Sequence, residues 1–274
     1  MFSRADLHIH STASDGKCTP RAIVAKAASI GLSIIALTDH DTIAGLEEAQ
    51  AAGILHGIEV VPGIELSAQH EEVEVHVLGY FIQPHKKELT DKLEILKRAR
   101  QKRALTILDR LQRLGLSIDW SQIKKHAAGD VIGRPHIARA LVEAGGVPSV
   151  KAAFESYLNR GCPAYVPRYR LTPEEAITLI HKCKGAAVLA HPGQLPDLSC
   201  LGPLLEFNWQ GIEIYHPDHS KEMRVALEGI ADSQNLIVTG GSDFHGKDCG
   251  NRNLGACTTD ITAVEMLRKG CQQR

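Results

Sequence analysis

Short clusters of histidine and acidic residues recur along this chain, and each cluster follows directly after an apolar run. In chain order the clusters are Asp6–His10, Thr38–Asp41, Gly63–Glu65, His76, Ala190–Pro192 and Gly241–His245. Imidazole and carboxylate are the ligands that borderline divalent metal ions take in proteins. Buried together without a cation, these groups would suffer large desolvation penalties. The pattern therefore predicts a site that binds several metal ions, and with it a hydrolytic activity.

The composition is that of an ordinary globular chain. Its 274 residues, 43% hydrophobic and 23% charged, suit one large domain or one domain with an insert. A net charge of −1 gives no overall attraction to nucleic acid or membrane, so any affinity for anions must come from a local site. No apolar run approaches the ~20 residues that span a bilayer, and no signal-peptide core precedes the first cluster. We therefore expect a cytoplasmic protein without membrane contact.

The cysteine and histidine contents carry separate information. The seven cysteines are odd in number, scattered and never form CxxC, which favours reduced thiols in the cytoplasm. Fourteen histidines are unusual beside only five phenylalanines. A single histidine is usually a surface or hydrogen-bonded core residue, and we expect this for His85, His126 and His181, which stand next to lysines.

Strand and helix patterns alternate in the first part of the chain and again in the last part. The expected strands are Asp6–His10, Ser33–Thr38, Ile58–Leu66, Val73–Ile82, Ala186–Ala190, Gly211–Tyr215 and Leu236–Thr239. The expected helices are Pro20–Ile30, Thr42–Ala52, Pro173–Lys182, Lys221–Ser233 and Ala263–Cys271. Thr19 and Thr172 each precede a proline, which is typical of a capped helix start. The strands are continuous apolar runs, and this favours a mainly parallel sheet.

Strand patterns disappear between residues 87 and 165. A long helical pattern covers Lys87–Leu114, and shorter ones cover Ser121–Ala127, Pro135–Ala144 and Val150–Asn159. An all-helical block inside an α/β alternation predicts an inserted subdomain. We therefore expect one α/β domain made of residues 1–86 and 166–274, and a helical insert made of residues 87–165.

The position of the clusters indicates how the sheet is arranged. They fall at the carboxyl ends of the expected strands, where α/β barrels hold their active sites. An open sheet would hold its site at the one point where the strand order reverses. Seven strand–helix units that all carry their clusters at the strand ends therefore favour a closed or nearly closed barrel. Within a strand, residues i and i+2 share a face, which pairs His8 with His10 and Asp243 with His245. One such pair arises easily by chance, but the succession of clusters is specific.

At this point a family resemblance is plain. Six segments resemble motifs of the PHP (polymerase and histidinol phosphatase) family of metal-dependent phosphoesterases. They are Asp6–Gly16, Leu37–Thr42, Pro62–Ala68, His76–Tyr80, Leu189–Gly193 and Gly241–Gly246. The resemblance covers nearly the whole chain. It implies a distorted (β/α)7 TIM-like barrel, the PHP fold, with an inserted helical subdomain and three divalent metal ions at the carboxyl ends of the strands.

The resemblance also implies a ligand set. The first metal ion would take His8, His10, Glu65 and Asp243. The second would take Asp15, His40 and His245. The third would take His76, His191 and Glu65, which bridges. The residues expected to carry catalysis are Asp15, His40, Glu65, His191, Asp243 and His245. Some family members have a histidine where this chain has Asp15, a difference expected to change metal preference more than activity.

The expected chemistry is hydrolysis of a phosphate monoester. The positive charge of three divalent ions exceeds the negative charge of three carboxylates, so the site would attract a phosphate dianion. Metal ions lower the pKa of bound water from about 16 towards 7 and clamp phosphoryl oxygens, so no serine or cysteine nucleophile is required. Ligands without thiolate admit Mn, Fe or Zn, of which we expect Mn²⁺. Asp39 and Asp41 are expected to orient imidazoles, although Asp41 could equally cap a helix.

The helical block contains a segment that bears on the substrate, Gly133–Arg139. Pro135 at a helix start would place Arg134 and His136 where an anion is favoured, the alternative being an ordinary cap with a solvated arginine. The segment resembles a PHP subgroup that acts on nucleoside 3′,5′-bisphosphates or 5′-phosphorylated RNA, in which the insert caps the site. Arg134 and His136 would then hold the phosphate that remains while the 3′-phosphate is removed. On RNA, the same geometry would release nucleotides from the 5′ end.

Two further segments could contact substrate. His216 and His219 follow a strand and could bind phosphate or donate a proton, or could belong to a polar loop. The basic run 97–103 could guide an RNA backbone, although such a run is more often the solvated face of a helix. Other hypotheses are a small-metabolite phosphatase, for example for histidinol phosphate, and a non-catalytic module that stabilises a partner. The complete ligand set argues against the last, and no obligate protein partner is expected.

Overall fold

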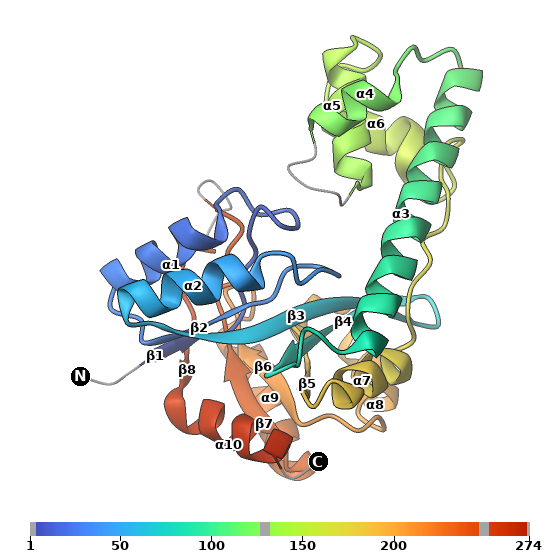
Figure 1. The fold of residues 1–274 in the computed structure, drawn as a ribbon. Coiled ribbons are helices and arrows are strands. Elements are labelled where there is room, and N and C mark those ends of the chain that lie inside the picture. Colours follow the sequence, from blue (N-terminus) through green and yellow to red (C-terminus); the bar gives the residue numbers. More distant parts are fainter. Residues whose placement is uncertain (1–3, 127–131, 247–251, 273–274) are drawn as a thin grey trace. The chain divides into compact units, whose positions relative to one another are not determined.

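The computed structural model describes residues 4–126, 132–246 and 252–272 (Figure 1). Ala127 of one expected helix, and Cys249, therefore lie outside the described residues. The chain forms two compact units, one made of Met1–Asp91 with Arg170–Arg274 and the other of Lys92–Tyr169. Among the described helices, none is both long and apolar enough to cross a membrane.

The first unit is built on an eight-stranded sheet with the order β7-β6-β5-β4-β3-β2-β1-β8. The strands are β1 (Arg4–Asp6), β2 (Ile34–Leu37), β3 (Glu59–His70), β4 (Val73–Tyr80), β5 (Ala186–Leu189), β6 (Gly211–Tyr215), β7 (Ile237–Gly240) and β8 (Thr259–Asp260). After β1, Leu7 donates its N–H to the Gly240 carbonyl (3.2 Å), and Ile9 forms a parallel bridge with Phe244. The chain beyond β1 thus meets the chain beyond β7, and the sheet is a nearly closed barrel. The predicted fold class is confirmed.

Several strands differ from the sequence prediction. β3 continues to His70 rather than ending at Leu66, so Glu65 lies inside the strand. β1 ends at Asp6 rather than His10. Beyond it, Leu7 and His10 donate to the carbonyls of Gly240 and Phe244, while Ile9 accepts the N–H of Thr38. β4 is antiparallel to both β3 and β5, so the sheet is less parallel than expected. β8 was missed because two residues are too few to show a period.

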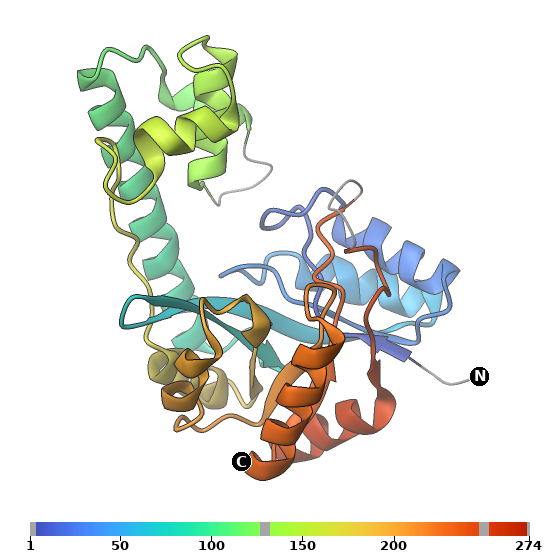
Figure 2. The same ribbon diagram turned by 180° about the vertical axis from the view of Figure 1, so that it is seen from behind.

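Helices flank the barrel, and the two that follow Thr19 and Thr172 start at the predicted capping signals. They are α1 (Pro20–Ser29), α2 (Leu46–His56), α7 (Pro173–Lys182), α8 (Leu201–Leu204), α9 (Lys221–Gln234) and α10 (Ile261–Gln272), with 3₁₀ turns η2 (Pro192–Gln194) and η3 (Leu198–Cys200). Figures 1 and 2 show α1 and α2 side by side, and many residues of the two helices are close. The Thr19 side chain accepts the N–H of Ala22, and Thr172 forms a capping box with Glu175.

The prediction for α2 was wrong at both ends. The helix starts at Leu46, so Asp41 does not cap it, and it continues through Gly53 to end at Gly57, whose φ of +67° is left-handed. Gly53 has a different role: a Cβ there would lie 2.7 Å from the Ile58 carbonyl oxygen. Its missing side chain lets α2 approach the start of β3, and it does not end the helix.

The core of the barrel unit consists of small and aliphatic side chains from the strands and α10. The buried members of one cluster are Ala5, Leu7, Ile34, Ala36, Val61, Leu78, Tyr80, Ala186, Val188, Ala190, Val264, Leu267 and Cys271. This dry interior fixes the strand positions, so the residues at the strand ends are held on a rigid frame.

The second unit is helical and has its own core. It contains most of α3 (Lys87–Arg113), then α4 (Trp120–Lys125), α5 (Arg134–Glu143), α6 (Val150–Ala153) and the π-helical turn η1 (Phe154–Leu158). Its core includes Ile107, Leu111, Ile123, Ile137, Leu141 and Leu158. Buried residues of the second half of α3, namely Ala104, Ile107, Leu108 and Leu111, pack inside this unit, as an amphipathic helix requires.

Candidate metal centre

His8 and His10 lie in the segment that leaves β1, and both side chains are fully buried. Their Nε2 atoms are only 3.1 Å apart. The segment is held by a pair of bonds between Ile9 and Thr38, and it packs against the residue after β7. That residue is Gly241, where a Cβ would lie 2.4 Å from the His8 Cβ. Only glycine permits this approach, which brings the two ends of the barrel sequence together.

Asp6 ties the first cluster to the last. Its carboxylate accepts the Ser242 N–H (2.9 Å), the Ser242 hydroxyl (2.6 Å) and the Gly255 N–H (2.8 Å). Burial raises the pKa of Asp6 to about 6, although these hydrogen bonds oppose the rise. Asp6 therefore serves as a clamp beneath the site and does not point into it.

Glu65 on β3 is the centre of the cluster. Its Oε1 lies 2.8 Å from His76 Nδ1 and 3.1 Å from His191 Nε2. Its Oε2 lies 2.9 Å from His40 Nδ1, 3.2 Å from His10 Nε2 and 3.4 Å from His8 Nε2. One buried carboxylate thus faces five imidazole rings, which agrees with its expected bridging position.

His76 reaches this carboxylate by an unexpected route. It lies in the first half of β4, paired with Ser67 of β3, and not at a carboxyl end. Because β4 runs antiparallel to its neighbours, its first half meets the ends of the parallel strands. The prediction that every cluster follows the carboxyl end of its strand was therefore wrong for His76.

Asp15 and His245 form the outer part of the cluster with His40. Asp15 Oδ1 lies 3.3 Å from His245 Nε2, and its Oδ2 lies 3.9 Å from His40 Nε2. Asp243 Oδ1 lies 3.2 Å from His10 Nε2 and 3.4 Å from His245 Nδ1. The Asp15 side chain is 48% exposed, whereas Glu65 is 1% exposed, so the cluster has a buried base and an open mouth.

The candidate ligand atoms form four overlapping groups. Inside each group, the ligand atoms lie within 4.8 Å of one another. The groups are His10, Asp15, His40 and His245; His8, His10 and Asp243; His8, Glu65 and His191; and His40, Glu65 and His76. These groups together contain all nine residues expected as metal ligands, and they come from six separate segments of the chain.

A separate observation supports metal binding by these donor atoms. Three buried atoms make no hydrogen bond among the residues that the structure describes: His10 Nδ1, His40 Nδ1 and Glu65 Oε2, of which the last two lie 2.9 Å apart. Buried polar atoms are nearly always satisfied. Imidazole nitrogens and a carboxylate oxygen crowded in this way are the donors that a divalent cation takes.

The charges of the cluster are perturbed by burial and by one another. Burial lowers the pKa of His10 and His76, but neighbouring carboxylates outweigh it and raise the two values to about 10 and about 9. Burial raises the pKa of Glu65 and Asp243, yet the imidazoles hold both well below their usual range. Without metal, the site therefore holds ionised carboxylates beside protonated rings.

Metal binding is expected to release protons and to strengthen as pH rises. A ring that coordinates a metal must be neutral, and His10 and His76 hold protons up to about pH 10 and 9 in the metal-free protein. The Mn²⁺ dissociation constant should fall by up to about tenfold per pH unit for each proton released. Calorimetric titrations at pH 7.0 and 8.5 in two buffers of different ionisation enthalpy test this. A pH-independent constant with no proton release would contradict it.

The same raised pKa values affect the metal-free fold. Protonation of His10 and His76 stabilises the folded state fully below their ordinary pKa of 6.5, and this contribution is lost as pH rises through about 9 and 10. The melting temperature of the chelated protein should therefore fall between pH 6.5 and 10. Protein loaded with metal should not follow this trend, because its rings are already neutral.

Several residues at the site have left-handed backbone conformations without being glycine. His191 has φ +25°, Asp243 has φ +48° and Asp41 has φ +51°. Such conformations cost about 1–3 kcal/mol each and persist where the surroundings enforce them, often at functional sites. No sequence pattern reveals them.

Asp39 and Asp41 act on the loops around the site. Asp39 accepts the N–H of Ser11 (2.7 Å) and the hydroxyls of Ser11 (2.7 Å) and Ser14 (2.6 Å). Asp41 accepts the N–H of Ser67 (2.9 Å). These bonds hold the loop that carries Asp15 and the strand that carries Glu65.

His216 and His219 are buried beside the cluster. His216 Nδ1 accepts the Asp218 N–H (3.1 Å), and its Nε2 faces Asp243 Oδ2 at 3.4 Å. His219 donates from Nδ1 to the Ile214 carbonyl (2.8 Å) and accepts the Gly193 N–H at Nε2 (3.0 Å). The backbone therefore engages both ring nitrogens of His219.

Arg134 and His136 lie at the start of α5 in the helical unit. His136 Nδ1 accepts the Gly133 N–H (3.1 Å), which places the ring proton on Nε2. Arg134 donates to the Leu158 carbonyl (3.2 Å), and its guanidinium lies over the Phe154 ring. The first turn of α5 thus has the ordinary cap that was given as the alternative, but its arginine is bonded to the chain and lies over an aromatic ring.

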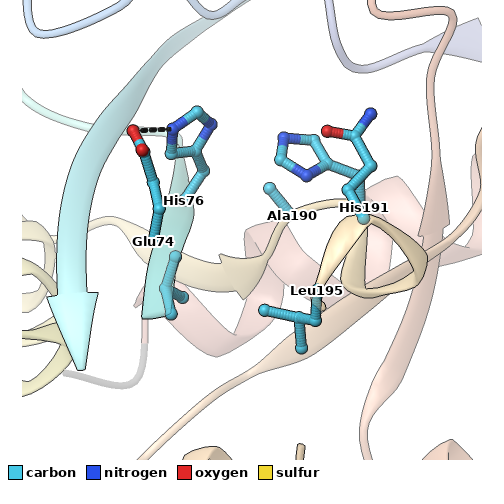
Figure 3. A pocket seen from close by; sticks show the side chains of 7 residues that line it. Glu74, His76, Ala190, His191 and Leu195 are labelled. Atoms are coloured by element: carbon cyan, nitrogen blue, oxygen red, sulfur yellow. Dashed lines mark hydrogen bonds and ion pairs between the residues drawn. The ribbon is translucent and has the colours of Figure 1, made fainter. Parts of the chain in front are cut away.

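A pocket of about 230 Å³ opens beside the cluster (Figure 3). It is lined by Glu74, Val75, His76, Ala190, His191, Gln194 and Leu195. Figure 3 shows the rings of His76 and His191 on its two sides, with Leu195 below. Glu74 lies 3.4 Å from His76 Nε2 and also pairs with Arg170 at 2.5 Å. The pocket gives space for an organic group next to two of the candidate ligands.

Sequence reasoning missed three residues of the site. Glu213, on β6, is fully buried against His8, and Glu74 contacts His76. Both had a signal: Glu213 interrupts an apolar strand, and Glu74 precedes a cluster histidine by two positions. Arg252, which pairs with Asp243 and Asp218, stands in no recognisable pattern.

The nearly closed barrel and the cluster at one end of it are those of a metal-dependent hydrolase. A family model described as PHP domain matches residues 6–159. A 5′-3′ exoribonuclease from Haemophilus influenzae is 36% identical over 93% of this chain and 94% of its own length. A 3′,5′-nucleoside bisphosphate phosphatase from Chromobacterium violaceum is 34% identical over 96% and 94%. A crystal structure of a protein assigned as a metal-dependent phosphoesterase from Bifidobacterium adolescentis has a TM-score of 0.83, at 33% identity over 97% and 96%.

The chain belongs to the PHP family. It is a metal-dependent phosphoesterase, that is, a phosphoric ester hydrolase, as the resemblance in the sequence implied.

Proposed function

We propose that this protein removes the 3′-phosphate of nucleoside 3′,5′-bisphosphates to give 5′-nucleotides, and that it also trims 5′-phosphorylated RNA from the 5′ end. The observation that carries the proposal is the convergence of all nine expected ligands, Glu65 among them, in four overlapping groups. The names of two relatives, an exoribonuclease and a bisphosphate phosphatase, support a nucleotide or RNA substrate.

We further propose three divalent metal ions, Mn²⁺ first, with Fe²⁺ or Zn²⁺ as alternatives. Residues that would hold them are His8, His10, Asp15, His40, Glu65, His76, His191, Asp243 and His245. When bound, the metal ions supply the positive charge that acidifies water and neutralises phosphoryl oxygens. The protein itself holds the ligand atoms in place, because phosphoryl transfer depends mainly on positioning and charge neutralisation.

The burial gradient supports a direction of approach for the substrate. Glu65, His8 and His10 form a dry base. Asp15 and His40 lie at the open mouth, so a phosphate monoester would approach from their side. The pocket between His76 and His191 would accept the organic part of the ester. His216, buried against Asp243, would act through that carboxylate, and His219 would act by fixing the turn at Gly193.

For the helical unit we propose the role of a cap, formed by residues 87–165 inserted between barrel residues 1–86 and 166–274. Arg134 and His136 would hold the phosphate that is not hydrolysed. Their place at the first turn of α5 supports this, because the free N–H groups and the helix dipole favour an anion there. Free thiols support a reducing compartment such as the cytoplasm, and they are Cys18, Cys162, Cys183, Cys200 and Cys257.

A substrate comparison with added Mn²⁺ tests the proposed function. Phosphate release should be fastest from a nucleoside 3′,5′-bisphosphate, and a 5′-phosphorylated oligoribonucleotide should yield mononucleotides from its 5′ end. Histidinol phosphate tests the small-metabolite alternative. A preference for histidinol phosphate would overturn the proposal, and absence of any hydrolysis by metal-loaded protein would favour the non-catalytic alternative.

Arg134→Ala should raise KM for nucleoside 3′,5′-bisphosphates by about 10–100-fold with little change in kcat. This corresponds to the loss of a charge-assisted hydrogen bond worth about 1.5–3 kcal/mol to bound substrate. Arg139→Ala, on the exposed side of the same helix, is the matched control. Unchanged bisphosphate kinetics in the Arg134 variant would remove the helical unit from substrate binding.

A further inference from the structure

Glu213 is a charged residue in the middle of an apolar strand. It lies on β6 between Ile212 and Ile214, and its side chain is fully buried. A buried carboxylate is strongly unfavourable unless it is paired and hydrogen-bonded. Glu213 is engaged twice: by the ring of His8 and by the backbone N–H of His191.

The first contact fixes the ring of His8. Both carboxylate oxygens of Glu213 are near His8 Nδ1, at 3.0 and 3.2 Å. With its proton on Nδ1, the ring presents the lone pair of Nε2 to Glu65 (3.4 Å) and Asp243 (3.5 Å). A carboxylate behind a coordinating imidazole sets both its tautomer and its orientation.

The second contact fixes the backbone of His191. Glu213 Oε2 accepts the His191 N–H at 2.9 Å. This residue has an unfavourable positive φ of 25°, and that turn directs its Nε2 to Glu65 at 3.1 Å. Glu213 is thus bonded to two residues that approach the same bridging carboxylate on its two oxygens, Oε2 for His8 and Oε1 for His191.

We propose that Glu213 is a positioning residue shared by two neighbouring metal sites, because one carboxylate sets the ring of His8 and the backbone of His191 together. This rests on the proposed metal-dependent function. It predicts that a single change at Glu213 weakens the binding of more than one metal ion, although Glu213 itself coordinates none.

Glu213→Gln is the sharpest test because it keeps the shape of the side chain. Its amide NH₂ cannot accept, so one of the two donors loses its partner. Metal affinity, measured by titration with Mn²⁺ alone and by elemental analysis, should fall by about 10–100-fold for more than one ion. Excess Mn²⁺ should restore kcat, and KM for substrate should stay unchanged, which a purely structural defect would not produce.

Glu228→Gln is the matched control. Glu228 accepts the hydroxyl of Tyr215, which lies on the same strand as Glu213, at 3.0 Å. This change should alter Mn²⁺ affinity by less than about threefold, because Tyr215 is not among the nine candidate ligands. Circular dichroism in chelator establishes that each variant is folded. Glu213→Asp, which keeps the charge on a shorter side chain, should show an intermediate affinity.

Two results would overturn the proposal. One is a folded Glu213→Gln protein that binds wild-type amounts of Mn²⁺ with wild-type affinity. The other is an unfolded Glu213→Gln protein together with a Glu213→Asp protein of wild-type affinity. Both readouts use metal alone, so a failure of the proposed substrates to react would count against the proposed function and leave the positioning role standing.

Discussion

Replacing Glu65 by Gln is expected to lower kcat about a thousandfold or more and to reduce the metal content of the purified protein. The Glu65 carboxylate faces five imidazole rings with two oxygens, and it is 1% exposed. An amide offers one acceptor and no charge. A loss of about 4 kcal/mol, the scale for breaking a buried charge pair, corresponds to roughly a thousandfold in rate.

The control for this change lies on the same strand. Glu59 is exposed and pairs with Arg268, so Glu59→Gln should leave kcat and metal content close to wild type. Phosphate release under saturating substrate and elemental analysis of both variants provide the measurements. If Glu65→Gln kept its metal ions and most of its turnover, Glu65 would not be the bridging group.

Removal of metal by chelation is expected to abolish phosphate release completely and reversibly. It should also lower the melting temperature by about 5–10 °C, since a ligand at a hundred times its dissociation constant contributes about 2.7 kcal/mol. Without metal, the surrounding imidazoles hold the pKa of Glu65 well below its usual range, so their positive charge balances its carboxylate. Activity that persists after elemental analysis shows the metal to be gone would refute metal dependence.

Much of the site was predictable because each candidate ligand stands beside a strand-like apolar run. His8, His40 and Asp243 could be assigned to one end of a barrel from strand order alone, and the structure brings them together. The family resemblance supplied the remaining partners, including His76, whose position on antiparallel β4 no local pattern indicates.

What could not be predicted depends on contacts between distant segments. Gly53 looks like a helix end in the sequence, but its missing side chain serves the packing of α2 on β3. Glu213 was visible as an acid in an apolar strand, yet only the fold shows that it meets His8 and His191. His191 has a positive φ and takes part in this distant contact through its N–H, and local sequence propensity does not predict either feature.

The hydrogen bonds of Asp6 have a consequence for how the protein folds during its synthesis. Its partners Ser242 and Gly255 stand 236 and 249 positions further along the chain. Contacts of such separation require closure of a very long loop and form slowly. The candidate metal centre therefore cannot be complete until the residues up to Gly255 have been synthesised and have docked against Asp6.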